Sequence, residues 1–469
     1  MIAPIIDLLL FFAITTPVLG WLCEKIKRPY LCGAYVTIGL AIALWQVLLM
    51  KFPIKISQFS IDQLSGLMAI TFLMLGIFAS IFSMKYLERD TGIPLFYTLL
   101  ILMIIGMIGA VFAGDFFTFF VFWEMMCISS YTLVAFRKEK WEPIEAAFKY
   151  LIMSSAGSAS ILFGMSLIYG MCGTLSFTEI SRILTEPNIW VYIASIFIFI
   201  GLGIKSAMFP LHTWLPDAHS AAPSPISAML SGVVVETGVY AICRIGFSIF
   251  SCIKWLEVIA ILSIFTMFIG NLTPLLQTDI KRLLAYSSIA HIGYMLAGIS
   301  TGTILGLTGA LMHIFNHAIM KGLAFLCSGV ILYRLETRDM REMLGVGRKM
   351  PITTTTLFIS LFALAGMPPL NGFISELTII LASIEANMIW LGIFIIINSI
   401  ISAAYYLRVL KAFLQPITLE NIKKVKEGPI IMLIPLILLA ILIIIFGIWP
   451  DSLMNYAKGA AYELLRGVL

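Results

Sequence analysis

The feature that most constrains this chain is the recurrence of apolar runs about as long as a bilayer is thick. A membrane-spanning helix needs roughly 20 predominantly apolar residues, and such runs follow one another along nearly the whole sequence. Only 12% of the 469 residues are charged, and the mean hydropathy is +1.02. So few charges cannot cover the surface of a water-soluble fold of this size. The sequence therefore predicts an all-α polytopic membrane protein.

We expect fourteen spans, at roughly residues 4–22, 30–50, 61–84, 93–113, 116–136, 146–171, 190–209, 224–249, 255–275, 283–299, 303–332, 353–384, 388–413 and 429–449. The first run lacks the flanking signals of a cleaved signal peptide, so we expect a retained span. The loops are too short to hold a nucleotide-binding domain. The seven cysteines form no CxxC pair and are interpreted as small apolar side chains.

Basic residues are distributed unequally between alternate loops. Loops after odd-numbered spans hold 20 of the 30 Lys and Arg residues, whereas loops after even-numbered spans and the C-terminal tail hold six. Because basic loops stay in the cytoplasm, we expect the odd-numbered loops to be cytoplasmic and both termini to lie outside. We expect a multi-pass protein of the cell (inner or cytoplasmic) membrane.

One apolar run, GLGIKSAMFPLHTWLPDAHSAAPSPI at residues 201–226, combines an embedded charge, Lys205, with a helix breaker, Pro210. Proline removes a backbone donor, so the helix must end or unwind there. Irregular backbone at membrane depth is tolerated only where protein or water surrounds it. Broken spans that hold an ionisable residue are typical of ion-translocating proteins. We therefore predict that this span breaks near Pro210 and that Lys205 lies on an ion path.

A second break is predicted within residues 353–384, where Pro368 and Pro369 interrupt the run and Glu376 follows. The two breaks are five spans apart, which is the arrangement of inverted five-helix repeats, here spans 4–8 and 9–13. The predicted parts are an N-terminal three-helix segment, two repeats with one half-channel each, and a last loop, helix and short tail, at residues 1–92, 93–250, 251–414 and 415–469.

Several other charges lie within the predicted spans. Glu124 has Lys205 as its obvious partner, either in a fixed ion pair or, as we favour, in a movable pair whose separation sets the proton affinity of the lysine. Glu236 lies between the two halves. Arg244, two turns further on, is expected to snorkel to the interface. Lys149, one turn inside its span, is either a gate through which protons enter or an anchor near the headgroups.

Two histidines and a lysine recur at a spacing of four in ALMHIFNHAIMKGLAFL. His313, His317 and Lys321 therefore share one stripe of a helix. Imidazoles titrate near neutral pH, so the stripe suits proton hopping, although ordinary buried histidines remain an alternative. His291, in LLAYSSIAHIGYML, presents the same choice. An HxxxH pair also binds zinc, but we expect no metal because nothing nearby in the sequence supplies a third ligand.

Placed at one depth, the embedded groups form a polar row across the membrane plane. The proton-translocating set that we predict is Glu124, Lys205, Glu236, His317, Lys321 and Glu376. The supporting or gating set is Lys149, His291, His313, Pro210, Pro368 and Pro369. The motifs around these residues resemble the antiporter-like subunits shared by respiratory complex I, Mrp-type Na+/H+ antiporters and energy-converting membrane-bound hydrogenases. They are GIKSAMFPLHTWLPDAHSAAPSPISAMLSG, DIKRLLAYSSIAHIGYM, HIFNHAIMKGLAFL and GMPPLNGFISE.

This resemblance covers about residues 60–415. It implies fourteen helices in two inverted repeats, with the seventh and twelfth spans broken. By motif position, Glu124, Lys205, Lys321 and Glu376 match the family's fifth-span glutamate, seventh-span lysine, central lysine and twelfth-span exit residue. Glu236 is a departure, because several family members carry a lysine there, and its effect on the coupling order stays open. The chain length and PLNGFISE favour the hydrogenase-like or Mrp-like assemblies over complex I.

The function that we expect is that of a proton-translocating, antiporter-like subunit of a multisubunit energy-converting complex. It would move H+, or exchange Na+ for H+, through two linked half-channels. We expect no cofactor in this chain and no nucleic-acid partner. Its partners would be the lipid bilayer, adjacent antiporter-like and other membrane subunits, and a redox module on the cytoplasmic side. The alternatives are a self-sufficient Na+/H+ antiporter and a structural membrane subunit without transport.

Overall fold

The structure, a computed structural model, describes residues 4–417 and 420–465, and about 80% of the chain is helical. Twelve helices in the described part are long and apolar enough to cross a membrane. They are α1 (Pro4–Lys25), α2 (Tyr30–Leu49), α3 (Gln63–Tyr86), α4 (Ile93–Phe112), α5 (Phe116–Val134), α6 (Trp141–Cys172), the continuous α10–η1–α11 (Ser224–Ser248), α12 with η2 (Trp255–Leu276), α13 (Ile280–Ser300), α14 (Ile304–Leu335), α17 (Ile389–Leu414) and α19 (Ile430–Ile448). The predicted helical, polytopic architecture is confirmed in this form.

The two spans predicted to break contain shorter helices. Helix α8 (Ile189–Lys205) ends at the predicted lysine, and α9 (Trp214–Ala221) begins after an irregular stretch that contains Pro210. Likewise, α15 (Pro351–Leu364) and α16 (Asn371–Glu385) flank Pro368 and Pro369. The smaller elements are β1 (Ile54–Ile56), β2 (Phe59–Ile61), α7 (Phe177–Ile183), η3 (Met340–Glu342), η4 (Val346–Arg348), α18 (Glu420–Lys423) and α20 (Asp451–Leu465).

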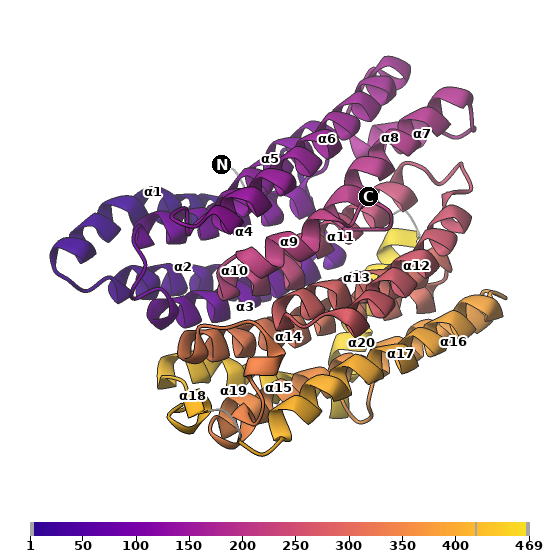
Figure 1. Ribbon diagram of the computed structural model, residues 1–469. Helices are drawn as coiled ribbons and strands as arrows, with labels where there is room; N and C mark the ends of the chain where they lie inside the picture. Colours follow the sequence, from indigo (N-terminus) through magenta and orange to yellow (C-terminus); the bar gives the residue numbers. More distant parts are fainter. Residues whose placement is uncertain (1–3, 418–419, 466–469) are drawn as a thin grey trace.

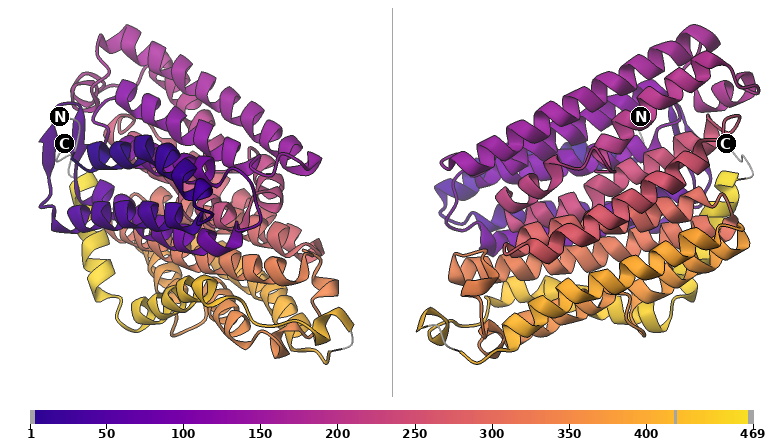
Figure 2. Two further views of the ribbon diagram at one scale, coloured as in Figure 1. Left: turned by 90° about the vertical axis from the view of Figure 1, so that its left-hand side faces the viewer. Right: turned by 45° about the vertical axis from the view of Figure 1, so that its right-hand side comes forward.

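The long helices run side by side, and the two halves of the chain occupy opposite sides of the bundle (Figures 1 and 2). The central helices carry most of the embedded ionisable groups. The apolar window of α10–η1–α11 is 100% buried and that of α13 is 94% buried, against 39% for α1 and for α2. Glu236 and His291 thus sit on helices enclosed by protein, as the cost of charge in lipid requires.

The outer helices expose large apolar side chains, as expected where lipid or neighbouring subunits surround the bundle. Ile14 on α1 is 73% exposed, Trp45 on α2 64% and Ile400 on α17 67%. A protein surrounded by water rarely shows apolar patches of this extent. The outward faces therefore agree with a multi-pass membrane protein.

The loops after even-numbered and odd-numbered predicted spans gather on different faces. On one face, strand β2 bridges to Ala113, and Asp115 bridges to Ser176, which joins the loops after the second, fourth and sixth predicted spans. On the other face, Arg137 pairs with Asp90 at 2.9 Å, which joins the loops after the third and fifth. These contacts join loops of like parity, and the face with the loops after odd-numbered predicted spans, which hold most of the basic residues, is called the basic face below.

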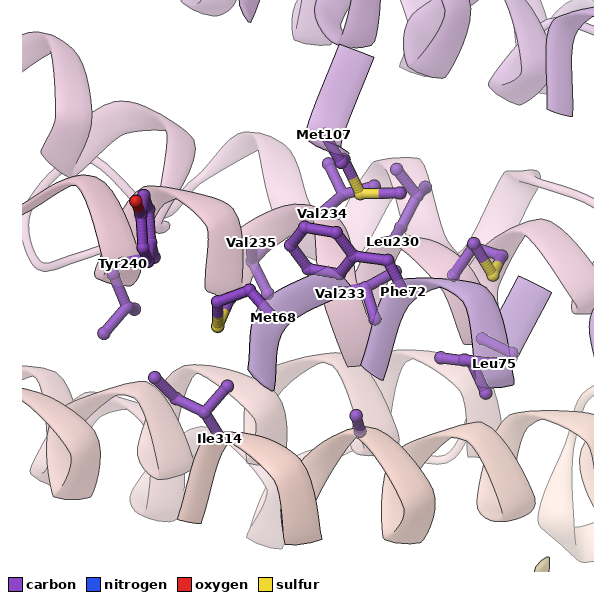
Figure 3. Packing of buried hydrophobic residues seen from close by; sticks show 14 of the residues in the cluster. Met68, Phe72, Leu75, Met107, Leu230, Val233, Val234, Val235, Tyr240 and Ile314 are labelled. Atoms are coloured by element: carbon purple, nitrogen blue, oxygen red, sulfur yellow. The ribbon is translucent and has the colours of Figure 1, made fainter. Parts of the chain in front are cut away.

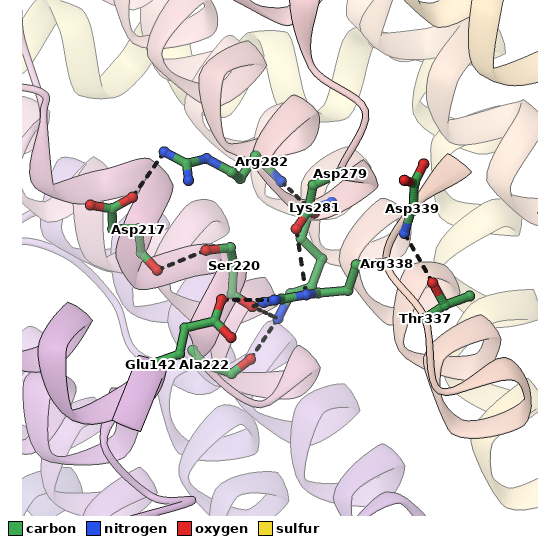
Figure 4. A network of polar contacts seen from close by, with 10 residues as sticks. All are labelled: Glu142, Asp217, Ser220, Ala222, Asp279, Lys281, Arg282, Thr337, Arg338 and Asp339. Carbon is green, nitrogen blue, oxygen red and sulfur yellow. Dashed lines mark hydrogen bonds and ion pairs between the residues drawn. The ribbon is translucent and has the colours of Figure 1, made fainter. Parts of the chain in front are cut away.

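A polar network on the basic face holds the two halves together (Figure 4). The ammonium of Lys281, at the start of α13, is 1% exposed and donates to the carbonyl oxygen of Ala222 at 2.5 Å. Arg338 donates to the carbonyl of Ser220 at 2.5 Å and to Glu142 at 2.7 Å. The segment after the first broken helix is therefore held by residues from the second half of the chain.

Arg244 on α11 does not snorkel to the interface, so that prediction is wrong. Its guanidinium forms two hydrogen bonds with Asp62, at 2.6 and 2.7 Å, and both side chains are about 5% exposed. Asp62 also caps α3 by accepting from the backbone amide of Ser65 at 2.9 Å. Its partner Asp62 lies 182 positions away along the sequence, so the residues around Arg244 give no sign of this buried ion pair.

Candidate functional site: a buried row of ionisable groups

Lys205 is the last residue of α8 and lies inside the protein, 2% exposed. Its ammonium donates to the hydroxyl of Tyr150 on α6 at 2.6 Å and approaches the hydroxyl of Ser130 on α5 at 3.5 Å. The two hydroxyls bond each other at 2.8 Å. Three helices therefore meet at the lysine. The hydrogen-bond partners of its ammonium group are neutral hydroxyl groups, which can relay protons.

The break after α8 and the lysine site form one packed unit. Ending the helix frees backbone carbonyls, and the indole N–H of Trp214 donates to the carbonyl of Ile204 at 2.8 Å. The same indole stacks on the Tyr150 ring with centroids 4.0 Å apart and an interplanar angle of 5°. Trp214 thus compensates for the break and holds the hydroxyl partner of Lys205 in place.

Glu124 on α5 is partly buried and accepts a short hydrogen bond from Ser158 on α6. Among the described residues, no ion pair within 4.0 Å joins it to Lys205. The thiol of Cys127, one turn further along α5, is within electrostatic range of both groups. The structure thus holds the two charges apart, and their predicted movable pairing stays a prediction.

Lys149 and Tyr150 are neighbours in the sequence, but one side chain points outward from α6 and the other points into the protein. Lys149 is about half exposed and pairs with Glu145 at 2.9 Å and Asp217 at 3.1 Å. Tyr150, about 100° further around the helix, is buried against Lys205. Sequence reasoning singled out the lysine and missed the tyrosine, because only the packing of α6 decides which of them points inward.

Glu236 on α11 and His317 on α14 form the central contact of the row. The carboxylate oxygen Oε1 lies 2.6 Å from the imidazole Nδ1, and both side chains are 0% exposed. Oε2 of Glu236 and Nε2 of His317 have no hydrogen-bond partner within the described protein. The pair therefore joins the two halves of the chain and has one free polar atom at each end.

A π-helical turn, η1 (Leu230–Val234), lies directly before Glu236. Such turns widen a helix by one residue and are frequent at functional sites. Around it, side chains of α3, α4 and α14, among them Phe72 of α3, form a dense apolar contact (Figure 3). The turn and this packing fix the direction in which Glu236 leaves its helix, and no sequence signal announced the turn.

The three buried histidines of the second half lie together. His291 Nδ1 is 3.0 Å from His313 Nε2, and His313 Nδ1 is 2.9 Å from the Ser375 hydroxyl. The His291 ring centroid lies 5.2 Å from that of His317. The predicted stripe of His313 and His317 on α14 therefore continues through a histidine of α13.

Among the described residues, the structure places two further candidate ligands beside one histidine of the HxxxH motif and none that is shared by both histidines. His291, His313 and Glu376 each offer a ligand atom within 4.8 Å of the other two. His317, the second histidine of the motif, is instead bound to Glu236. This cluster combines His313 with residues distant in the sequence, which spacing alone does not reveal, and the expectation of no metal at the HxxxH pair stays a prediction.

Lys321 is fully buried on α14, one turn beyond His317. Its ammonium donates to the carbonyl of Leu284 at 3.1 Å and makes a short hydrogen bond with the hydroxyl of Ser287, both on α13. Like Lys205, this lysine is satisfied by neutral oxygens in the described structure. The two lysines thus occupy similar chemical environments in the two halves.

Glu376 lies on α16, just after the second break, and is 4% exposed. Its Oε2 accepts from the Ser399 hydroxyl at 3.2 Å, and its Oε1 has no partner in the described protein. Gly366 in the break has a positive φ of 67°, and a Cβ there would lie 2.6 Å from Glu376 Oε2. The positive φ favours glycine at this position, and a larger residue would also force the Glu376 carboxylate to move.

His219 is a further buried group that sequence reasoning passed over. It stacks on Phe325 with ring centroids 4.9 Å apart, is 0% exposed, and has neither ring nitrogen bonded within the described protein. The sequence did place His219 in the WLPDAHS segment directly after the first predicted break, which could have marked it as a candidate site residue.

The fold and this row define a polytopic membrane protein with a protein-enclosed chain of ionisable groups. Residues 113–402 match the family described as NADH:quinone oxidoreductase/Mrp antiporter, TM, and residues 46–97 match the complex I chain 5 N-terminus family. The chain therefore belongs to the NADH:quinone oxidoreductase/Mrp antiporter family of membrane subunits, as its motifs predicted.

Relatives of known name or structure cover nearly the whole chain. F(420)H(2) dehydrogenase subunit N of Methanosarcina mazei is 31% identical over 431 residues, 88% of this chain and 87% of that protein. A chain of the archaeal membrane-bound sulfane sulfur reductase matches with a TM-score of 0.90 and 30% identity, over 99% of this chain and 97% of that one. A chain of the Mrp complex from Dietzia sp. DQ12-45-1b, 23% identical, shares the fold with a TM-score of 0.87, over 99% of this chain and 98% of that one. This chain is an antiporter-like membrane subunit of the same type.

Proposed function

We propose that this chain translocates protons within a multisubunit energy-converting complex. The observation that carries the proposal is the contact between Glu236 and His317, because it joins a helix of the first half to a helix of the second through two fully buried titratable groups. Such groups are costly inside a membrane protein and mark ion and proton pathways. A purely structural subunit would have no use for the row.

The proposed path runs along this row. Glu124 and Lys205 form a gated pair in the first half, with Tyr150 and Ser130 as hydroxyl relays. A proton passes through Glu236 to His317 in the second half. Buried polar atoms need partners, and the free Oε2 of Glu236 is suited to bond a water molecule that brings the proton to this pair.

Beyond His317, the remaining groups offer a way out. The imidazoles of His291 and His313 are linked to each other, Lys321 sets the local charge, and Glu376 is the exit residue beside the second break. Oε1 of Glu376 has no partner within the described protein, and a carboxylate oxygen of Glu376 lies within 4.8 Å of ring nitrogens of His291 and His313. We propose that it passes the proton to the far side.

The proposed topology has fourteen spans, with broken spans seven and twelve and two inverted five-helix repeats at 93–250 and 251–414. The segment 1–92 precedes them, and 415–469 follows them. The basic face would be cytoplasmic and both termini would lie outside the cell membrane. A cavity of about 570 Å³ on that basic face, lined in part by Glu142, Lys281 and Arg338, supports proton access from this side.

The partners that we propose are adjacent antiporter-like and other membrane subunits, with a cytoplasmic redox module that supplies the energy. The relatives named above are subunits of a dehydrogenase, a sulfur reductase and an Mrp complex. Related chains are therefore found in complexes with different partner subunits. We propose no redox cofactor for this chain. The vesicle experiment described next also distinguishes proton pumping alone from exchange of Na+ for H+.

The test is ion uptake by sealed vesicles that contain the whole native complex, with pH and Na+ followed together during redox turnover. Glu236→Gln preserves the shape of the side chain but carries no proton, so we expect proton uptake to fall at least about 100-fold. Glu257→Gln, at an exposed position on α12, is the matched control and retains wild-type uptake. Unchanged uptake by an assembled Glu236→Gln complex would refute the proposed path. A Na+ signal of opposite direction in the wild type would identify exchange.

A further inference from the structure

We propose that His291, His313 and Glu376 form a buried binding site for a divalent transition-metal ion of the Zn2+ class. The three come from α13, α14 and α16, and their ligand atoms lie within 4.8 Å of one another. In a tetrahedral zinc site with Zn–N distances of about 2.0–2.1 Å, two nitrogen ligands are roughly 3.3 Å apart. His291 Nδ1 and His313 Nε2 are already 3.0 Å apart.

The carboxylate supplies the observation that points independently to a ligand. Glu376 is 4% exposed, and its Oε1 has no hydrogen-bond partner among the described residues. Its other oxygen accepts from Ser399 at 3.2 Å, which steadies the group. A buried carboxylate oxygen beside two imidazoles is suited to complete a set of three ligands, since zinc accepts both kinds of donor.

Each ligand also has the outer partner that metal ligands usually have. Such histidines bond their second ring nitrogen to a neighbour, which fixes the tautomer and the ring orientation. His313 Nδ1 bonds the Ser375 hydroxyl at 2.9 Å. When that hydroxyl gives its one proton to the carbonyl of Gly372, 3.1 Å away on its own helix, it accepts from Nδ1 and leaves Nε2 free to ligate. His291 Nε2 faces the Tyr406 hydroxyl at 3.5 Å.

The donor set selects the ion. Two neutral imidazoles and one carboxylate, with a fourth position open, suit Zn2+ and similar borderline ions. Mg2+ and Ca2+ are hard cations that prefer oxygen ligands, and Na+ is also a hard cation. This cluster is therefore a poor Na+ site.

Occupation of the site would interrupt the row. In the metal-free arrangement, one proton lies between His291 Nδ1 and His313 Nε2. A metal ion bound to both nitrogens displaces this proton, and His291 stays a neutral imidazole by carrying a proton on Nε2, the nitrogen that faces the Tyr406 hydroxyl. The expected consequence is inhibition of transport by Zn2+. This consequence rests on the proposed function, whereas metal binding itself does not.

The experiment is equilibrium dialysis of the purified whole complex against buffered free Zn2+, with zinc counted per complex. We expect His291→Gln, His313→Gln and Glu376→Gln each to bind one ion fewer than the wild type. His212→Gln removes a histidine outside the cluster and should bind as the wild type does. Ser375→Ala keeps all three ligands and should weaken binding about 10- to 100-fold, which provides a test even if a ligand variant fails to assemble.

Equal zinc content in the wild type and in the assembled ligand variants or Ser375→Ala would overturn the site. X-ray absorption at the zinc edge should show two imidazoles per bound ion in the wild type, and a spectrum without histidine ligands would also overturn it. Zn2+ that binds as expected but leaves vesicle uptake unchanged would contradict the proton path and leave the metal site standing. The two proposals can therefore fail separately.

Discussion

The buried pair of Arg244 and Asp62 gives the prediction with the best-defined magnitude. It ties the start of α3 to α11, the helix that carries Glu236, through hydrogen bonds of 2.6 and 2.7 Å at sites about 5% exposed. Asp62→Asn keeps the side-chain shape and the cap on Ser65, but leaves the guanidinium buried without a counter-charge. Breaking a buried pair in this way costs about 3–5 kcal/mol.

Hydrogen exchange in the intact complex measures this cost locally. A loss of 3–5 kcal/mol corresponds to amide exchange at the start of α3 and in α11 that is faster by roughly 100-fold to several thousand-fold. The double variant Asp62→Asn/Arg244→Met removes both charges and should regain most of the protection. Proton uptake per assembled complex should persist, because we place neither residue on the path. Acceleration below about 10-fold in Asp62→Asn would refute the reasoning.

Three further predictions concern the first half-channel and its break. Tyr150→Phe deletes the hydroxyl that Lys205 donates to at 2.6 Å, so we expect the free energy of unfolding to fall by about 1–3 kcal/mol. Proton uptake in vesicles should also be slower, and wild-type uptake would contradict the role of Tyr150 as a relay. Trp214→Phe keeps the stacking but frees a buried carbonyl, and exchange should accelerate by about 10- to 100-fold around the break, whereas unaltered exchange would argue against this cap. A Cβ at position 238 would lie 2.7 Å from the backbone nitrogen of Ser206, so Gly238→Ala should separate α11 from the break and reduce uptake in assembled complexes; full uptake would show that this close packing is unnecessary.

The helices and breaks could be predicted because they follow from local chemistry. Apolar runs of bilayer length form helices whatever they pack against, and Pro210 and the Pro368–Pro369 pair lie where two of the spans are interrupted. Lys205, Lys321 and Glu376 were identified for the same reason, since a charge in such a run must be enclosed by protein. The stripe of His313 and His317 followed from helical spacing alone.

The contacts that complete the site could not be predicted in this way. Glu236 and His317 are 81 positions apart, and their meeting depends on a π-helical turn and on how α11 packs against α14. Tyr150 was not predicted, because the neighbouring charged residue, Lys149, was the more obvious candidate in the sequence. Arg244 found its partner at the start of α3, a contact that no spacing rule anticipates.

Infrared difference spectroscopy of the whole complex during redox turnover tests most directly whether Glu236 carries protons. If this carboxyl group gains and loses a proton in each cycle, its C=O stretching band must appear in the difference spectrum. We predict that the band is absent in Glu236→Gln and unchanged in Glu257→Gln. Identical difference spectra in the wild type and in Glu236→Gln, with pumping intact, would contradict the central claim that protons cross between the halves through Glu236 and His317.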